Sequence, residues 1–442
     1  MKNQSKTFCP IPWLHQAVKN NGKYRLCCQA NVTSNQGIVR KEDGTAFNAS
    51  EDSIQDAYNG DLLKKVRSSM LKGEWNPECS RCMIEEATGL MSRRPNEVEQ
   101  WKDTFTFEDA LKVTAPDGSI DMKPIYYDLR FGNFCNLKCR MCGPTDSHQW
   151  YDEHVEFYDE QGFNDTEGFV KLIQTDKGRW STPDYDWHED DRFWKDLESN
   201  MPNIRRVYMA GGEPLLIEKH YDFLQLCIDN DCAKNIYLEY NTNLSVLPDR
   251  AKELWKKFKG VRVGASIDGM EEVLEYQRYP LKWNVVLENL RQLDKLAEEN
   301  TNIEPGIGYT VTAYNAFHFP KFIWWKLFES GFKKINGIER RPVISYHVLH
   351  EPDRLSIQML PLGIKENLKS VYRDYQERLQ NSDLDNNTKN TAIEMLDAVL
   401  NFAFLEDKFE MQKDFIKFTT FLDLKRNQSI LDIAPELGEL FE

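Results

Sequence analysis

From residue 124 onward, short β-branched or aromatic runs alternate with longer amphipathic stretches, and this alternation constrains the fold more than any other feature. The runs that read as strands lie at residues 125–131, 205–210, 235–241, 261–267, 306–314 and 342–349. The clearest helical patterns between them lie at residues 217–230, 248–259 and 283–300. Repeated strand–helix units predict a parallel sheet or barrel of the α/β class. A functional site is then expected at the carboxyl ends of the strands.

The rest of the chain differs from this pattern. Residues 1–100 are rich in turn formers and cysteine, with few apolar residues to make a core of their own, so a metal is a plausible organiser. A turn at 115–118 lies within a predicted linker. We predict a cysteine-rich module at 1–100, a linker at 101–123, a core domain at 124–355 with an acidic and aromatic insertion at about 150–190, and a helical extension at 356–442.

Composition limits the possible partners. The chain of 442 residues carries a net charge of −15, and such a field repels the phosphates of nucleic acids. It has no apolar run long enough for a membrane span, and its first residues lack the apolar segment of a secretion signal. We therefore expect a cytoplasmic protein whose partners include neither nucleic acid nor membrane.

Ten cysteines in such a protein require an explanation. Disulfides are rare in the cytosol, so clustered cysteines there usually bind metal. Cys227 and Cys232 lie in a helix-like segment, and we expect them to be packing residues. The other eight precede residue 143 in two groups: Cys9, Cys27, Cys28, Cys79 and Cys82, and then Cys135, Cys139 and Cys142.

The second group, in the stretch CNLKCRMC, has the spacing C-x3-C-x2-C and directly follows the first predicted strand. Three thiolates can hold three irons of a [4Fe–4S] cluster and leave the fourth iron open to another ligand. An open iron can do chemistry, whereas a closed cluster mainly transfers electrons or holds the fold. The alternative is a structural zinc or iron–sulfur loop that has a distant fourth ligand.

With Met141 before its last cysteine, this loop resembles the signature of the radical S-adenosylmethionine (SAM) superfamily. The resemblance covers about residues 124–350 and implies a partial (β/α)6 TIM-like barrel. It implies that Cys135, Cys139 and Cys142 are catalytic cluster ligands, and that SAM binds the open iron through its amino and carboxylate groups. An electron from the cluster would then cleave SAM to methionine and a 5′-deoxyadenosyl radical, which abstracts a hydrogen atom.

Motifs after the later strands resemble the SAM contacts of the same family. The segment MAGGEP resembles the family's GGE motif, which binds the SAM amino group. The resemblance assigns NTN to the ribose, SIDG to the carboxylate or ribose, and VTAYN to the adenine side. Arg278 resembles the arginine that binds the carboxylate, which suits its bidentate guanidinium, although it can also be a surface helix residue. The residues concerned are Gly211, Gly212, Glu213, Pro214, Asn241, Asn243, Ser266, Arg278 and Val311.

The amino-terminal cysteines lie in FCPIPW, RLCCQA and ECSRC, an arrangement that resembles the SPASM/twitch auxiliary-cluster module. The resemblance implies one auxiliary [4Fe–4S] cluster, and Cys28 is the alternative to Cys27 as a ligand. A zinc site with four cysteine ligands is the competing interpretation. The module usually follows the barrel, so its position before the barrel leaves open which face meets the active site. The expected ligands are Cys9, Cys27, Cys79 and Cys82.

Polar residues near strand ends are the candidates for substrate contact. Asp423, Arg426 and Asn427, near the end of a predicted helix, can cap that helix or reach the site, and we favour capping. The strand-end candidates are Asp128, Arg130, His148, Trp150, Arg340, Arg341, Tyr346, His347, His350 and Glu351.

The sequence therefore predicts a radical SAM enzyme that abstracts hydrogen from an unactivated C–H bond. The substrate is a peptide or protein, or a small molecule such as an amino acid or sugar, and the electron donor is a reductant such as a flavodoxin or ferredoxin. Relatives often begin with a winged-helix domain that binds peptides, whereas the first residues of this chain form the cysteine-rich module. This difference makes leader-dependent peptide modification a weaker prediction. The alternative from another class is a non-catalytic iron–sulfur or zinc scaffold.

Overall fold

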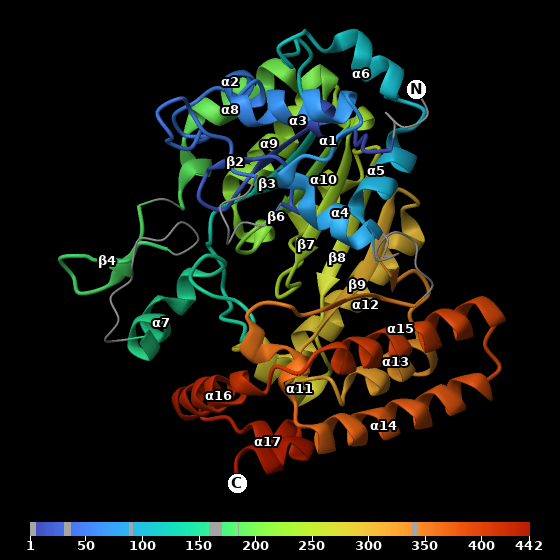
Figure 1. Cartoon of the computed structure of the whole chain (residues 1–442). Coiled ribbons are helices and arrows are strands. Elements are labelled where there is room, and N and C mark those ends of the chain that lie inside the picture. The colour runs from blue at the N-terminus through green and yellow to red at the C-terminus, as the bar shows by residue number, and fades with distance from the viewer. Residues whose placement is uncertain (1–5, 31–36, 88–91, 159–169, 184, 338–342) are drawn as a thin grey trace.

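The computed structural model describes residues 6–30, 37–87, 92–158, 170–183, 185–337 and 343–442. At its centre six parallel strands form an open sheet with helices between them, which confirms the α/β class and the partial barrel (Figure 1). A short strand, β10 (Asn336–Gly337), pairs with the start of β9, ahead of β11 on the same edge. In chain order the six strands are β3 (Tyr126–Arg130), β6 (Arg206–Ala210), β7 (Tyr237–Thr242), β8 (Gly260–Ser266), β9 (Ile303–Val311) and β11 (Ser345–Val348).

The two faces of this sheet differ in chemistry because side chains alternate along each strand. Asp128, Tyr208, Glu239 and Arg262 occupy one row of the register across four strands, so a polar row lines one face. Their neighbours Tyr127, Val207, Leu238 and Val261 form the next row and are fully buried. The sheet therefore has a polar inner face and an apolar outer face.

Amphipathic helices cover the outer face. In α12 the buried residues Val286, Leu290, Leu293 and Ala297 recur at the three- and four-residue spacing of one helical stripe. Asn200, the last residue of α8, donates a hydrogen bond to the Tyr127 hydroxyl at 2.8 Å. The barrel helices are α8 (Asp191–Asn200), α9 (Glu218–Asp229), α10 (Asp249–Trp255), α11 (Glu271–Gln277), α12 (Trp283–Glu299) and α13 (Phe319–Phe328).

The amino-terminal region continues the barrel sheet, which the sequence did not lead us to expect. Strand β1 (His15–Val18) pairs in parallel with β3, and β2 (Tyr24–Arg25) pairs antiparallel with β1. The helices of this region are α1 (Ile11–Leu14), α2 (Ile54–Tyr58), α3 (Asp61–Leu71), α4 (Ser80–Ala87), α5 (Arg93–Trp101) and α6 (Phe107–Val113). Figure 1 shows α4 and α5 in front of the strands, whereas α2 packs beside the barrel helix α8.

Part of the predicted linker at 101–123 has regular structure. Helix α6 begins with a capping box, in which the Thr106 and Asp109 side chains each accept a hydrogen bond from the other's backbone N–H. A β-bridge between Thr114 and Ile120 follows it. The fully buried Trp13 donates a hydrogen bond from its indole to the Thr114 hydroxyl at 2.7 Å, so this segment packs on the amino-terminal region.

The predicted insertion near 150–190 carries a helix and a small hairpin. Helix α7 (Tyr151–Tyr158) follows the cysteine loop, and β4 (Ile173–Gln174) pairs antiparallel with β5 (Trp180–Ser181). Tyr151, Val170, Leu172 and Tyr185 form a small apolar cluster separate from the main core. The insertion therefore has its own minor core outside the barrel.

The predicted carboxyl-terminal extension is helical, as expected. Helices α14 and α15 pack against each other along their length, and α16 and α17 lie beside them (Figure 1). No helix in the described ranges is both long and apolar enough to cross a membrane. The helices are α14 (Leu362–Gln380), α15 (Asn386–Leu405), α16 (Gln412–Arg426) and α17 (Ile430–Ile433).

A buried histidine makes the stability of the barrel depend on pH. His220 in α9 is fully buried, and its Nε2 lies 2.7 Å from the Tyr240 hydroxyl. Burial, and next the positive charge of Arg250, lower the pKa of His220 to about 3. The unfolded chain, with an ordinary histidine pKa, binds the proton more readily, so stability is full above about pH 6.5 and is lost as the pH falls.

We expect His220→Gln to reduce this acid sensitivity. Between pH 7 and pH 5 the wild type should lose about 2 kcal/mol of unfolding free energy that the variant does not lose. The measurement is urea unfolding of both proteins at the two pH values. An equal loss in both proteins would show that His220 does not stay neutral in the folded state.

Candidate active site

The three cysteines of the loop after β3 converge at the carboxyl end of the sheet. Cys139 lies close enough to both Cys142 and Cys135 for their thiols to influence one another's pKa. Asn243 Nδ2 lies 3.7 Å from the Cys135 Sγ, and Arg278 Nη1 lies 4.0 Å from the Cys139 Sγ. Burial raises the pKa of Cys135 to about 12, so in the absence of metal this thiol stays protonated.

The GGE segment connects the cysteine loop to the neighbouring strands. Gly212 has φ +48°, and a Cβ on it would lie 2.2 Å from the Phe134 carbonyl oxygen, so only glycine fits there. The Glu213 N–H donates to that same carbonyl at 2.8 Å. The fully buried Glu213 carboxylate accepts from the Thr242 hydroxyl and the Asn243 N–H, both at 2.7 Å. Burial raises its pKa to about 7.

The other predicted SAM contacts lie on this same edge with different orientations. Arg278 is buried, and its Nη2 is 2.6 Å from the Asp268 carboxylate. Ser266 is half-buried at the end of β8, and Asn241 is exposed on β7. Val311 at the end of β9 is fully buried, and strand alternation points its side chain to the outer face, so only its backbone faces the site. Pro214 is buried at the start of a 3₁₀ turn, and Met141 is half-buried beside Cys142.

Four of the amino-terminal cysteines surround one cavity. Cys9, Cys27, Cys79 and Cys82 all line it, together with Arg93 and Arg94. The Cys28 Sγ points elsewhere, into a second cavity, where it accepts a hydrogen bond from Arg93 Nη1. This grouping supports Cys27 rather than Cys28 as the fourth ligand. Over the described ranges, no three cysteine, histidine or carboxylate side chains already stand at the distances of a closed metal-ion site.

Several other candidates from the sequence contact the cysteine loop or the barrel interior. His148 stacks on Phe134, and its Nδ1 accepts the Cys135 N–H at 3.3 Å. The buried Trp150 donates to the Cys139 carbonyl at 3.0 Å. These two residues therefore shape the backbone of the loop.

The remaining candidates lie farther along the chain. Asp128 and Arg130 face the barrel interior as an ion pair of 3.3 Å. Tyr346 and His347 lie on β11, with His350 and Glu351 just after it. Partial burial, and next the positive charge of Arg81 in α4, lower the pKa of His350. Arg340 and Arg341 lie outside the described residues.

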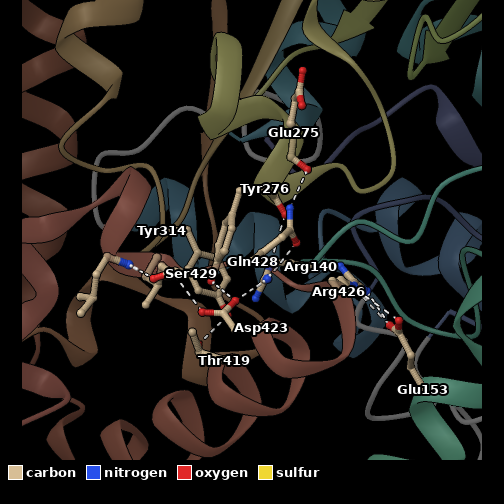
Figure 2. Close-up of polar contacts among 12 residues, drawn as sticks. Arg140, Glu153, Glu275, Tyr276, Tyr314, Thr419, Asp423, Arg426, Gln428 and Ser429 are labelled. Carbon is tan, nitrogen blue, oxygen red and sulfur yellow. Dashed lines mark hydrogen bonds and ion pairs between the residues drawn. The ribbon is translucent and has the colours of Figure 1, made fainter.

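The carboxyl-terminal helix α16 anchors the cysteine loop, whereas the sequence analysis favoured helix capping for its last residues (Figure 2). Arg140, between two of the loop cysteines, is fully buried, and its Nη2 lies 2.6 Å from the Asp423 carboxylate. Its guanidinium also stacks over the Tyr276 ring at 3.5 Å and donates to the Tyr276 carbonyl. Arg426 forms an ion pair of 2.7 Å with Glu153 in α7.

Of the three residues near the end of α16, only Asn427 caps the helix. It adopts the left-handed conformation at φ +50°, as a C-cap residue often does. Asp423 and Arg426 instead bind the cysteine loop and the helix after it, so the capping prediction was wrong for them. No local pattern could reveal this, because 283 residues separate Asp423 from Arg140.

Two family models match the chain. The radical SAM superfamily model matches residues 129–310. The model of SPASM, an iron–sulfur cluster-binding domain, matches residues 9–83. The chain contains a radical SAM domain preceded by a SPASM domain. These matches confirm the predicted family and the predicted cofactor classes, which are SAM with an iron–sulfur cluster in the radical SAM domain and a further cluster in the SPASM domain.

Solved structures with detectable similarity include anSMEcpe with bound AdoMet and Cp18Cys peptide, at 18% identity and a TM-score of 0.34, covering 58% of this chain and 60% of that chain. Streptococcus suis SuiB bound to S-adenosylmethionine is 11% identical with a TM-score of 0.33, and the match covers 78% of this chain and 66% of that chain. The structure of SuiB bound to precursor peptide SuiA is 10% identical with a TM-score of 0.33, and the match covers 83% of this chain and 71% of that chain. This chain thus spans about 60% of the length of anSMEcpe. Among curated proteins none matches.

Proposed function

We propose that this protein is a radical SAM enzyme that starts its reaction by hydrogen abstraction from an unactivated C–H bond. The observation that carries the proposal is the convergence of three free thiols, the GGE segment and Arg278 on one edge of the sheet. Three cysteine ligands leave one iron of a [4Fe–4S] cluster free of protein thiolate, which suits binding of SAM. Such a SAM-bound cluster supplies a 5′-deoxyadenosyl radical when it accepts an electron.

The residues of the radical SAM domain have distinct roles in this proposal. Cys135, Cys139 and Cys142 would hold the cluster. The glycines of the GGE segment let a ligand approach the backbone closely, and Arg278 would bind the SAM carboxylate through the face of its guanidinium that Asp268 leaves free. Asn241 and Asn243 would contact the ribose side, and Ser266 would contact the carboxylate or the ribose. The residues after the cysteine loop, His148 and Trp150, keep its backbone in place.

We further propose that the SPASM domain holds one auxiliary cluster on Cys9, Cys27, Cys79 and Cys82. It would transfer electrons or stabilise the fold, and the reductant would be a protein such as a flavodoxin or ferredoxin. The substrate would be a peptide, a protein or a small molecule. All ten cysteines are free thiols, which fits a reducing compartment such as the cytoplasm.

The test is anaerobic incubation of the full chain with SAM and dithionite, with 5′-deoxyadenosine measured by chromatography. We expect 5′-deoxyadenosine and methionine in equal amounts. Protein that carries its full iron content and yet forms none would instead be a non-catalytic scaffold, and the proposed activity would have to be abandoned.

The assignment of the auxiliary ligands makes a separate prediction. Replacing Cys79 and Cys82 by alanine should lower the iron content from about eight to about four per chain and leave the SAM-binding cluster intact. Cys28→Ala, the matched control, should keep about eight irons because this thiol lies outside the four-cysteine cavity. The measurement is iron, sulfide and zinc per chain after anaerobic purification. Loss of iron from Cys28→Ala would make Cys28 the ligand, and zinc in the wild type would make the module structural.

A further inference from the structure

A polar cavity of about 350 Å³ lies between the inner face of the barrel sheet and the amino-terminal region. The sheet side is formed by residues of β3, β6, β7 and β8, and the opposite side by α5 and the segment after β2, which carries Cys28. Most ligand pockets are lined mainly by apolar side chains, whereas this one is lined by charged ones. A ligand in this cavity must therefore carry charge that complements these side chains.

The cavity is positively charged, although the whole chain has a net charge of −15. Four arginines line it and only three carboxylates do. The carboxylates are Glu97, Asp128 and Glu239, and the arginines are Arg93, Arg130, Arg206 and Arg262. The excess of one positive charge favours an anionic ligand in this low-dielectric space.

The ion pairs show where that excess charge lies. Arg93 pairs with Glu97 at 2.8 Å, and Arg130 with Asp128 at 3.3 Å. Glu239 is shared, because Arg206 Nη2 approaches it at 2.5 Å and Arg262 Nη2 at 2.8 Å. One carboxylate thus serves two guanidinium groups, so the unbalanced charge lies on the arginine pair of β6 and β8.

Arg206 has unused hydrogen-bond donors. Its side chain is only 8% exposed, yet its Nε and Nη1 atoms have no hydrogen-bond partner. The Tyr126 ring packs on this guanidinium, with its centroid 4.7 Å away, and holds its plane. Buried donors are normally satisfied, so these two N–H groups lack the oxygen partners that such donors usually have. Nε–H lies on the Nη2 side of the guanidinium and Nη1 on the Cδ side, so each atom can donate a separate hydrogen bond to an oxygen of a carboxylate or phosphate.

The position of the cavity relates it to the proposed chemistry. Arg130 is the last residue of β3, and its Cα lies 3.0 Å from where a Cβ on Gly211 would be, so this end of the cavity lies at the GGE segment. The other end reaches Cys28, next to the proposed auxiliary ligand Cys27. A molecule in the cavity would thus lie between the two cysteine sites.

We propose that this cavity is a substrate site, in which Arg206 binds the carboxylate or phosphate group of a small acidic molecule. That the bound molecule is the substrate rests on the proposed radical SAM activity, whereas the anion site itself does not. The enclosing sheet and α5, and a volume within the range of small-molecule pockets, favour a small ligand over a peptide.

The test is calorimetric titration of the full chain, purified anaerobically and kept free of SAM and reductant, with inorganic phosphate and separately with succinate. We expect one of them to bind the wild type, and Arg206→Gln to weaken that binding about tenfold or more. Arg205→Gln is the matched control, since the exposed Arg205 donates to the Pro202 and Ile204 carbonyls outside the cavity. Binding of phosphate alone or of succinate alone identifies the anionic group.

A second variant covers the case in which Arg206→Gln does not fold, as judged by circular dichroism. Arg130→Gln removes a charge from the neighbouring strand β3 on the same wall of the cavity and should also weaken anion binding. Absence of binding by the wild type at 50-fold excess of either anion, or equal binding by wild type and a folded cavity variant, would overturn the proposal. Because this assay needs no SAM cleavage, a wild type that cleaves SAM without binding anions keeps its proposed activity and loses only the anion site.

Discussion

Replacing Cys135, Cys139 and Cys142 together by alanine should abolish SAM cleavage and lower the iron content from about eight to about four per chain. The three thiols converge at the carboxyl end of the sheet, and Asn243 and Arg278 lie within hydrogen-bonding reach of two of them. No other residue of this edge offers a thiolate to hold the irons in their place. The measurements are 5′-deoxyadenosine formation with dithionite and iron and sulfide per chain.

The matched control for this loss is Cys232→Ala. Cys232 is buried, and its thiol donates only to the Asn230 carbonyl at 3.3 Å, far along the chain from either cysteine group. This variant should keep both its iron and its SAM cleavage. Cleavage that survived the triple change would show that the cluster is held elsewhere, and the central assignment would be wrong.

The second large effect is expected at the anchor between α16 and the cysteine loop. Asp423→Ala should lower the unfolding free energy by about 3 kcal/mol, because it leaves the Arg140 charge buried without its partner. Arg140 is fully buried, and Asp423 also accepts from the Tyr276 hydroxyl and the Ile430 N–H, both at 2.8 Å (Figure 2). Chemical denaturation of wild type and variant measures the difference.

Asp423→Ala should also weaken the binding of the SAM-binding cluster, because Arg140 directly follows the cluster ligand Cys139. We expect faster loss of iron from this cluster in air, measured by its visible absorbance. Asp414→Asn, an exposed acid of the same helix, should change neither property appreciably.

A double variant separates the anchor from a simple packing effect. Arg140→Leu with Asp423→Leu removes both charges and should recover much of the stability that Asp423→Ala loses, because no buried charge is left unpaired. If the double variant were as unstable as Asp423→Ala, the loss would come from the shape of the helix contact rather than from the ion pair.

The amino-terminal region, which contains the SPASM domain, packs on the barrel beside the polar cavity. Strand β1 extends the β3 edge of the barrel sheet, and α5 faces the sheet across the polar cavity. The usual order of barrel and module is reversed along the chain, and this pairing shows which edge of the barrel the module meets.

Local patterns in the sequence were sufficient to predict the strand–helix alternation, the six barrel strands and the two cysteine groups. These features depend on interactions between residues close in the chain, such as the alternation along a strand and the spacing of apolar residues on a helix. The GGE segment was found through its resemblance to the family motif, whereas the close approach of Gly212 to the Phe134 carbonyl is a tertiary contact.

Only the tertiary structure decided which distant residues meet. The parallel pairing of β1 with β3, the separation of Cys28 from the other four amino-terminal cysteines, and the ion pair of Arg140 with Asp423 join segments that no short pattern links. The free donors of Arg206 likewise arise because Glu239 is shared with Arg262 on a third strand. Such contacts depend on strand register and helix packing, which the whole folded chain sets.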